Sequence, residues 1–326
     1  RDAVASLVDA YCLYGLGNID FLRGDLSASH MTLGEALDKA QNSQEKLLET
    51  EVLRALAEIA WRRGEADRAE LYRRRAVLTV ERFGDVEERA LMQLNTAEFL
   101  SQSGQPSDAE ARAKEAIDSF EELGKRHYVA HSLLLLGKIA QGRGANKDAA
   151  ESLRKAHRFY EMFRDRRGLT ECKYHLADLA FAIRRFPDTQ SLVRDALEGY
   201  RAMGARRGEA RCWMLVGRLE RELGKLDKSE RTFAEAARTF SDLGDLRLAI
   251  VANLMRALVL DEAGHHEDAD AIIDDVRSLL PGYAPLIEAM ATVLELLSDA
   301  LASRRPEISL EFDGLHDLVA QRLGRS

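Results

Sequence analysis

The stretch LLLLGKIAQGRGANKDAAESLRKAHRFY, residues 133–160, contains the pattern that decides the fold. Gly137 is followed seven residues later by Gly144, and Ala156 comes twelve residues after that. Glycine takes the left-handed conformation that ends a helix at low cost, so Gly144 predicts a tight turn between two helices. Gly137 and Ala156 then lie in the middle of these helices, where a close crossing tolerates little bulk. Tyr160, four residues after Ala156, stays on the same face of the second helix.

The same spacing recurs every 40 residues in seven copies. The turn column is Gly24, Gly64, Gly104, Gly144, Arg184, Gly224 and Gly264. The small column of the first helix is Gly17, Ala57, Ala97, Gly137, Ala177, Gly217 and Ala257, and that of the second helix is Ala36, Ala76, Ala116, Ala156, Ala196, Ala236 and Val276. Three columns with one period predict an array of helix-turn-helix repeats. One pair cannot bury its apolar stripe alone, so the copies must stack.

These columns resemble the tetratricopeptide repeat over residues 1–284 or so, with the fullest match at 133–160 and good matches at 213–240 and 53–76. The family's usual period is about 34 residues. The 40-residue period here is similar to the longer variant of kinesin light chains, spindle-orientation adaptors and bacterial regulators with helical sensor arms. The resemblance implies a right-handed superhelical solenoid whose concave groove docks a peptide or protein.

The predicted fold class is therefore all-α, with about seven repeats over residues 1–284 and a degenerate capping pair over residues 285–326 in the same continuous solenoid. Arg184 replaces the turn glycine of the fifth copy, so we expect that turn to bend differently. The last copy ends near Pro281 and Gly282, and Pro285 opens a further helical stretch. The final helix is predicted from one apolar stripe: Ile308, Phe312, Leu315, Val319 and Leu323.

Composition excludes several classes of protein. The chain has 326 residues, of which 46% are apolar and 31% charged, as is typical of a folded, soluble protein. A net charge of −8 argues against nucleic-acid binding, which normally needs a basic face. No run of 18 apolar residues occurs, so we expect no membrane partner. The chain begins at Arg1 without a methionine, and we expect it to be a piece of a longer protein.

Cysteine and histidine usage gives no sign of a metal or other cofactor, and we expect none. The three cysteines include no CxxC pair, which favours a reducing, cytoplasmic setting. Cys12, Cys172 and Cys212 share one place in their repeats, so each is expected to be a small buried residue. His127 and His131 are four residues apart but lack a third ligand.

Candidate partner-binding residues come from the first helix of each copy, which lines the concave surface in the resembled family. They are Tyr14, Asn18, Arg54, Glu58, Trp61, Arg62, Asn95, Glu98, Lys138, Tyr174, Asp178, Arg211, Arg218 and Arg221. Aromatic and arginine side chains together are typical of binding hot spots. The three arginines of the sixth copy could bind an acidic or carboxylate-ended peptide bidentately.

The sequence therefore favours a partner-binding scaffold, in which the chain is the regulatory or sensor arm of a larger signalling protein. Two other functions stay open: a self-association module that forms homo-oligomers, and an arm that senses a small ligand or peptide. An enzyme is not expected, because a regular solenoid supplies no enclosed pocket of the kind that catalysis prefers.

Overall fold

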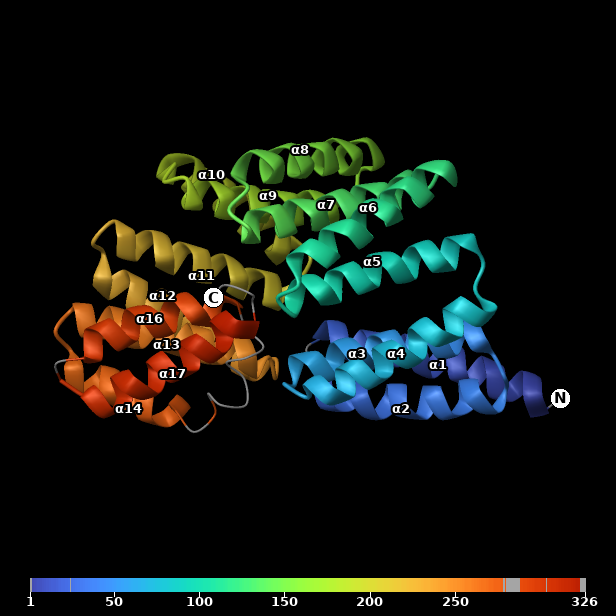
Figure 1. Cartoon of the computed structure of the whole chain (residues 1–326), viewed down its shortest axis with the longest axis horizontal. Helices are drawn as coiled ribbons and strands as arrows, with labels where there is room; N and C mark the ends of the chain where they lie inside the picture. Colours follow the sequence, from blue (N-terminus) through green and yellow to red (C-terminus); the bar gives the residue numbers. More distant parts are fainter. Residues whose placement is uncertain (1, 24, 278, 280–287, 303, 323–326) are drawn as a thin grey trace. The chain divides into compact units, whose positions relative to one another are not determined.

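The computed structural model describes residues 2–23, 25–277, 279, 288–302 and 304–322 (Figure 1). Within these ranges all regular structure is helical, which confirms the all-α prediction. The chain forms two compact units, the first from residues 1–92 and 241–247, the second from residues 93–240 and 248–326. Each unit is described by itself.

The first unit contains two helix pairs. Their bounds are α1 Asp2–Arg23, α2 Leu26–Asn42, α3 Lys46–Arg62 and α4 Ala66–Phe83. Helix α5, Val86–Gln102, runs across the boundary between the units. Up to α13, odd-numbered helices are the first helices of their repeats and even-numbered ones are the second. The predicted helix-turn-helix repeat is confirmed in both units.

The second unit continues the same alternation. Its helices are α6 Pro106–Glu122, α7 Arg126–Gly142, α8 Asn146–Phe163, α9 Arg166–Ala182, α10 Phe186–Ala202, α11 Arg206–Glu222, α12 Leu226–Asp242, α13 Leu246–Glu262, α14 His266–Arg277, α16 Glu288–Leu301 and α17 Pro306–Arg322. Residues 241–242 at the end of α12 and 246–247 at the start of α13 belong to the first unit. Ile308, Phe312 and Leu315 are buried, as the terminal stripe predicts. The side chain of Val319, residues 281, 282 and 285, and Leu323 lie outside the described residues. One continuous solenoid over the whole chain stays a prediction.

Close crossing within a pair explains the small column of the first helix. A Cβ atom on Gly17 would lie 2.6 Å from Leu33 Cγ of the second helix, and one on Gly137 would lie 2.6 Å from Leu153 Cγ. The crossing also brings a main-chain carbonyl within reach of the second helix. Ser29 Oγ donates to the Gly17 carbonyl at 2.7 Å. Glycine is therefore needed where the facing side chain is large.

The turns show that a left-handed residue, not glycine itself, is what the repeat requires. Gly144 and Gly224 have φ of 73° and 70°, and Arg184 takes φ 58° at the same place in the fifth copy. The expectation of a differently bent fifth turn was therefore wrong. A non-glycine residue in this conformation costs roughly 1–2 kcal/mol, and the helices packed on either side hold Arg184 there.

Replacing Arg184 with glycine is expected to raise the free energy of unfolding by about 0.5–1 kcal/mol, because the strain at this turn is removed. The Arg184–Glu222 ion pair offsets little, since 71% of the arginine side chain is exposed. Urea denaturation checks the result, with Arg185→Gly as the neighbouring control. A variant less stable than the native chain would contradict the strain argument.

The cysteine column has one exception. Cys172 and Cys212 are fully buried, as expected, but Cys12 on α1 is exposed. Burial raises the pKa of both buried thiols to about 12, so they remain protonated and inert. The prediction that Cys12 is buried was wrong, because no described helix pair precedes α1 to cover it.

Candidate partner-binding strip

Side chains of adjacent first helices contact one another in register. We call these residues the first-helix strip, which contains most of the candidate positions predicted from sequence. The contacts join residues 36 to 41 positions apart, as in Tyr14–Glu51, Asp178–Arg218 and Arg221–Glu262. A separation near 40 is one repeat, so each contact links one copy to the next.

In the first unit the strip joins α1 and α3. Tyr14 Oη donates to Glu51 Oε2 at 3.1 Å, and Arg54 Nη2 donates to the same oxygen at 2.6 Å. Asn18 lies one turn after Tyr14 on the same helix. The half-buried Tyr14 ring and the shared carboxylate fix the side-chain positions at this place.

The next turn of α3 repeats this arrangement with a cation over a ring. Arg62 Nε donates to Glu58 Oε1 at 2.7 Å. The Arg62 guanidinium carbon also lies 4.1 Å from the centroid of the Phe21 ring on α1. A guanidinium over an aromatic face is attracted by the ring quadrupole, which helps to fix the position of Arg62.

In the second unit the strip is densest between α9 and α11. Arg211 Nη1 donates to Glu171 Oε2 at 3.1 Å, and the Arg211 guanidinium carbon lies 4.1 Å from the Tyr174 ring centroid. His175 Nε2 lies 3.3 Å from Arg211 Nη2. Arginine can only donate, so a neutral His175 accepts this bond at Nε2.

Burial and neighbouring charge explain the protonation states of this cluster. Burial, and then the charge of Arg211, lower the pKa of His175 well below its usual value, which keeps the ring neutral. Burial alone would raise the pKa of Glu171, but the charge of Arg211 outweighs it and holds that pKa well below its usual range. Burial raises the pKa of Tyr174 to about 12. The cluster is therefore one ion pair surrounded by neutral polar groups.

Asp178 is the centre of a second cluster on the strip. Gln141 Nε2 donates to Asp178 Oδ2 at 2.7 Å from the preceding copy, and Arg218 Nη1 donates to Oδ1 at 3.0 Å from the following copy. The Arg218 guanidinium carbon lies 4.4 Å from the Phe181 ring centroid. Three successive first helices, α7, α9 and α11, are thus joined through one carboxylate.

The other charged strip residues of the second unit are paired as well. Lys138 Nζ lies 3.9 Å from Glu98 Oε1, and Arg221 Nε donates to Glu262 Oε2 at 2.9 Å. Each of the three arginines of the sixth copy therefore has a carboxylate partner. They do not form an uncompensated basic patch, so the arrangement gives no specific support to a preference for acidic peptides.

Some predicted residues stand apart from these clusters. Trp61 is 3% exposed, so its ring offers a partner little surface, and Asn95 is half-buried on α5. Sequence reasoning missed four residues of the strip: Glu51, Glu171, His175 and Glu262. The sequence did contain a signal for such contacts, namely residues of opposite charge 40 positions apart. Glu171 and Arg211 form one such pair, and Asp178 and Arg218 form another.

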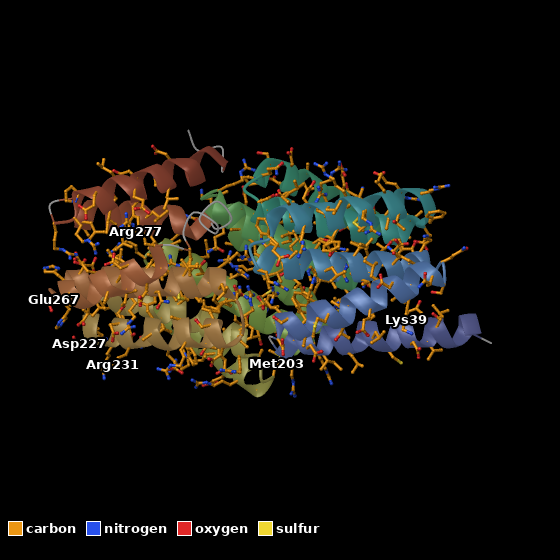
Figure 2. All side chains as sticks on the ribbon, turned by 90° about the horizontal axis from the view of Figure 1, so that it is seen from below. Lys39, Met203, Asp227, Arg231, Glu267 and Arg277 are labelled. Atoms are coloured by element: carbon orange, nitrogen blue, oxygen red, sulfur yellow. The ribbon has the colours of Figure 1, made fainter. Side chains whose placement is uncertain are left out.

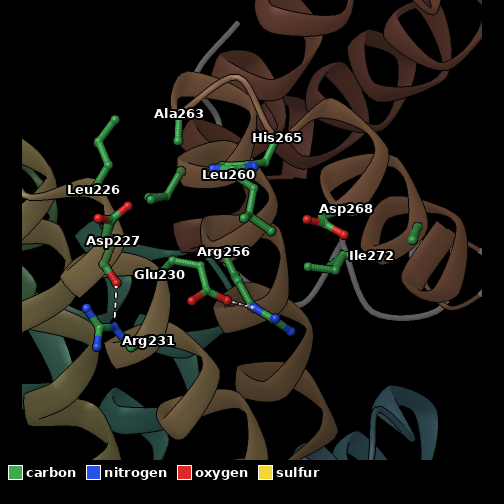
Figure 3. A pocket seen from close by; sticks show the side chains of 12 residues that line it. Leu226, Asp227, Glu230, Arg231, Arg256, Leu260, Ala263, His265, Asp268 and Ile272 are labelled. Carbon is green, nitrogen blue, oxygen red and sulfur yellow. Dashed lines mark hydrogen bonds and ion pairs between the residues drawn. The ribbon is translucent and has the colours of Figure 1, made fainter.

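A cavity of about 570 Å³ lies among α12, α13 and α14 of the second unit (Figure 3). Arg256 Nε donates to Glu230 Oε1 across it at 2.6 Å, and Arg231 Nε donates to the Asp227 carbonyl at 3.0 Å. Asp227 and Arg231 lie at the molecular surface (Figure 2). Arg256 and Arg231 therefore each have a local hydrogen-bond partner.

No group of three or more His, Cys, Asp or Glu residues in the described ranges is placed to hold a metal ion. None of the described helices is long and apolar enough to cross a membrane.

Comparison with known proteins supports the fold. No family model and no curated protein matches the chain. A Rap protein complexed with Competence and Sporulation Factor is similar to 98% of this chain and 88% of its own length, at 14% identity and a TM-score of 0.65. The Rap conjugation gene regulator of plasmid pLS20, in complex with the Phr peptide, is similar over 95% and 96% of the two chains, at 14% identity and a TM-score of 0.56.

A third similar structure is a STAND protein with a tetratricopeptide repeat sensor from Pyrococcus horikoshii. It matches 96% of this chain and 47% of its own length, at 15% identity and a TM-score of 0.56. Identities this low show similarity of fold alone. The predicted resemblance to tetratricopeptide repeats is thus confirmed at the level of an all-α solenoid of stacked helix pairs.

Proposed function

We propose that this chain is a scaffold that holds a partner protein or peptide against the first-helix strip. The observation that carries the proposal is that, within each unit, contacts between copies fix aromatic and charged side chains in place. Tyr14 is an example in the first unit, and Tyr174 and Arg218 are examples in the second. A binding surface that is ordered before the partner arrives loses less conformational entropy on association. The Rap proteins of similar fold are complexed with Competence and Sporulation Factor and with the Phr peptide, which supports the same role here.

The chain serves as the regulatory or sensor arm of a larger signalling protein in the cytoplasm, and it performs no chemical reaction. An arginine stacked on a ring, such as Arg218 over Phe181, presents planar donors to peptide carbonyls as well as to carboxylates. Peptide backbone is therefore a suitable ligand for a strip whose charges are already paired.

Peptide display against the immobilised full chain tests this function. Selected peptides are measured by fluorescence anisotropy against the native chain and a Lys138→Ala/Arg218→Ala variant. Both residues lie on the strip and are partly exposed, at 35% and 41% of their side chains. We expect binding about tenfold weaker, as for loss of a hot-spot residue.

The matched control is Lys228→Ala/Arg231→Ala, which removes the same charge from exposed positions on α12. It should leave the affinity of each peptide unchanged. Peptides that lose affinity equally with both variants would bind through net charge alone. A display that selects no peptide at all would count against the scaffold and favour self-association.

A further inference from the structure

The second helix of the fourth copy, α8, and the turn that follows it form a basic surface. Residues 154–167 contain six lysines or arginines and two acidic residues, so this stretch carries a net charge of +4 in a chain whose net charge is −8. The equivalent stretches of the third and fifth copies, 114–127 and 194–207, carry −1 and +2. The strong positive charge is therefore a property of the fourth copy and not of the repeat.

Five exposed arginines of this stretch make no ion pair with any residue that the structure describes. We call these residues the α8 arginine patch: Arg154, Arg158, Arg164, Arg166 and Arg167. Arg154 and Arg158 are one turn apart on the same face of α8 (Figure 1), and the other three lie in the turn to α9 and at its start. The patch thus differs from the arginines of the sixth copy, each of which has a carboxylate partner.

The two acidic residues of the stretch do not neutralise the patch. Asp165 caps α9 by accepting from the Gly168 main-chain N–H at 3.0 Å, and its second carboxylate oxygen lies 3.9 Å from His127 Nε2. Among the described residues, no ion pair joins Glu161 or Asp165 to an arginine. The guanidinium groups of the patch therefore face solvent without a carboxylate of their own.

Arg164 takes a backbone conformation that other copies give to glycine. Its φ is 54°, and Gly124 and Gly204, at the same place in the third and fifth copies, have φ of 68° and 63°. This left-handed conformation costs free energy for an arginine, and no ion pair within the described ranges offsets the cost. Backbone strain of this kind is common at binding sites, where the side chain serves a ligand.

Two exposed apolar side chains lie within the patch. Met162 and Phe163, at the end of α8, are 57% and 40% exposed. Met162 follows Arg158 by one turn on the same face of the helix, and the Phe163 ring lies edge-on to His127 of α7 with the ring centroids 6.0 Å apart. At the place of Met162 the third copy has Glu122, so the exchange of an acidic for an apolar residue accompanies the gain of positive charge.

We propose that the α8 arginine patch, together with Met162 and Phe163, binds an acidic segment of a partner protein. Arginine binds carboxylates bidentately, which gives geometric specificity as well as charge complementarity. Arginine, methionine and aromatic side chains are also enriched at the centres of protein interfaces. The partner segment should therefore have apolar side chains between its Asp and Glu residues. The patch contains no residue of the first-helix strip, so this inference does not rest on the proposed function.

Other occupants fit the patch less well. None of the residues outside the described ranges is Asp or Glu, so those residues cannot supply the acidic segment. A second copy offers the acidic helix α14, but Asp270 and Asp274 of that helix are already paired with Arg304 and Arg305. The patch lies in the fourth of seven copies, so a segment joined to either end would have to span three copies to reach it. A partner protein needs no such linker.

The probe is a phage-displayed library of peptides in which Asp or Glu alternates with a randomised residue. The library is selected on the immobilised 326-residue chain, and the selected peptides are measured in solution by fluorescence anisotropy. We expect an excess of leucine, methionine and aromatic residues at the randomised places, because these side chains would contact Met162 and Phe163. Binding should be at least about tenfold weaker with Arg154→Gln/Arg158→Gln, as for loss of hot-spot residues.

Arg164→Gly gives a second readout. The substitution introduces the glycine of the third and fifth copies, so the melting temperature should stay native or rise by a few degrees. Affinity for the selected peptides should nevertheless fall about threefold or more, because a bidentate donor is lost. A variant that is at least as stable as the native chain but binds less well cannot owe its weaker binding to unfolding.

The matched control is Lys228→Gln/Arg231→Gln, which removes the same charge from exposed positions on α12. It should leave the affinity of each selected peptide unchanged. Peptides that bind the first-helix strip should be unaffected by Arg154→Gln/Arg158→Gln, so failure of one surface leaves the other to be tested separately.

Four results would overturn the proposal. The first is a library that yields no binding peptide. The second is an equal loss of affinity with Arg154→Gln/Arg158→Gln and with the control, which would show binding through net charge alone. The third is a native chain that self-associates in light scattering and becomes monomeric with the patch variant, which would make a second copy the occupant. The fourth is patch-dependent binding to anionic phospholipid vesicles without binding to the peptides, which would make a membrane surface the occupant.

Discussion

Gly168→Leu is expected to lower the free energy of unfolding by about 3 kcal/mol or more, at the upper end of overpacking effects. A Cβ atom on this residue would lie 2.2 Å from Tyr160 Cδ1, and Tyr160 is only 2% exposed. The ring must therefore leave its place in the interface between the fourth and fifth copies. Tyr160→Ala alone should cost a similar 3–5 kcal/mol through the cavity it creates.

The double variant Tyr160→Ala/Gly168→Leu should be more stable than either single variant. The same pair of sizes already occurs between the first and second copies, where Ala40 faces Leu48 and both are buried. Urea denaturation followed by circular dichroism gives the four free energies of a double-mutant cycle. Gly314→Leu is the control for glycine loss, because nothing lies within 4 Å of the added Cβ atom there. If the losses in unfolding free energy of the two single variants simply add in the double variant, the idea that a small residue on one copy compensates for a large one on the next is refuted.

This pairing of large and small residues between neighbouring copies also explains how much of the fold was predictable. The period and the small columns appear in the sequence because each copy meets the same neighbours and must solve the same close crossing. Arg184 breaks the glycine column without breaking the turn, since packed helices can impose a left-handed conformation that propensity disfavours. The place of a residue in the 40-residue repeat therefore predicts its backbone conformation better than its residue type does.

The candidate site was predictable as a set of positions but not as a set of partners. The repeat register identified the faces of α9 and α11, yet Arg211 was expected to be free for a ligand and is paired with Glu171. A single helix wheel cannot show this, because the partner lies one copy earlier. The exposure of Cys12 was missed for a related reason: the repeat register treats Cys12 and Cys172 alike, although among the described helices only Cys172 has a helix pair before it in the chain.

Arg211→Leu is expected to lower the free energy of unfolding by about 2–4 kcal/mol at neutral pH, because it leaves a carboxylate without its partner in a mostly buried place. The Arg211 and Glu171 side chains are 19% and 26% exposed. Arg218→Leu removes a pair at the same separation along the chain, but 41% of that arginine side chain is exposed. Arg218→Leu should therefore lower the free energy of unfolding by no more than about 1 kcal/mol. Glu171→Leu/Arg211→Leu should recover most of the loss, because neither charge is then buried alone.

The pH dependence separates loss of charge pairing from loss of packing. In the native chain the pKa of Glu171 is held below its ordinary value of 4.5, so its contribution to stability is present above that value and is lost as pH falls towards the folded-state pKa. In Arg211→Leu the charge of Arg211 is gone and burial raises the pKa of Glu171, so protonation stabilises the folded variant as pH falls. The difference in unfolding free energy between the two chains should therefore shrink between about pH 6 and about pH 4. A difference that stays constant over this range would show that Arg211 acts through packing on Tyr174 and not through the charge of Glu171.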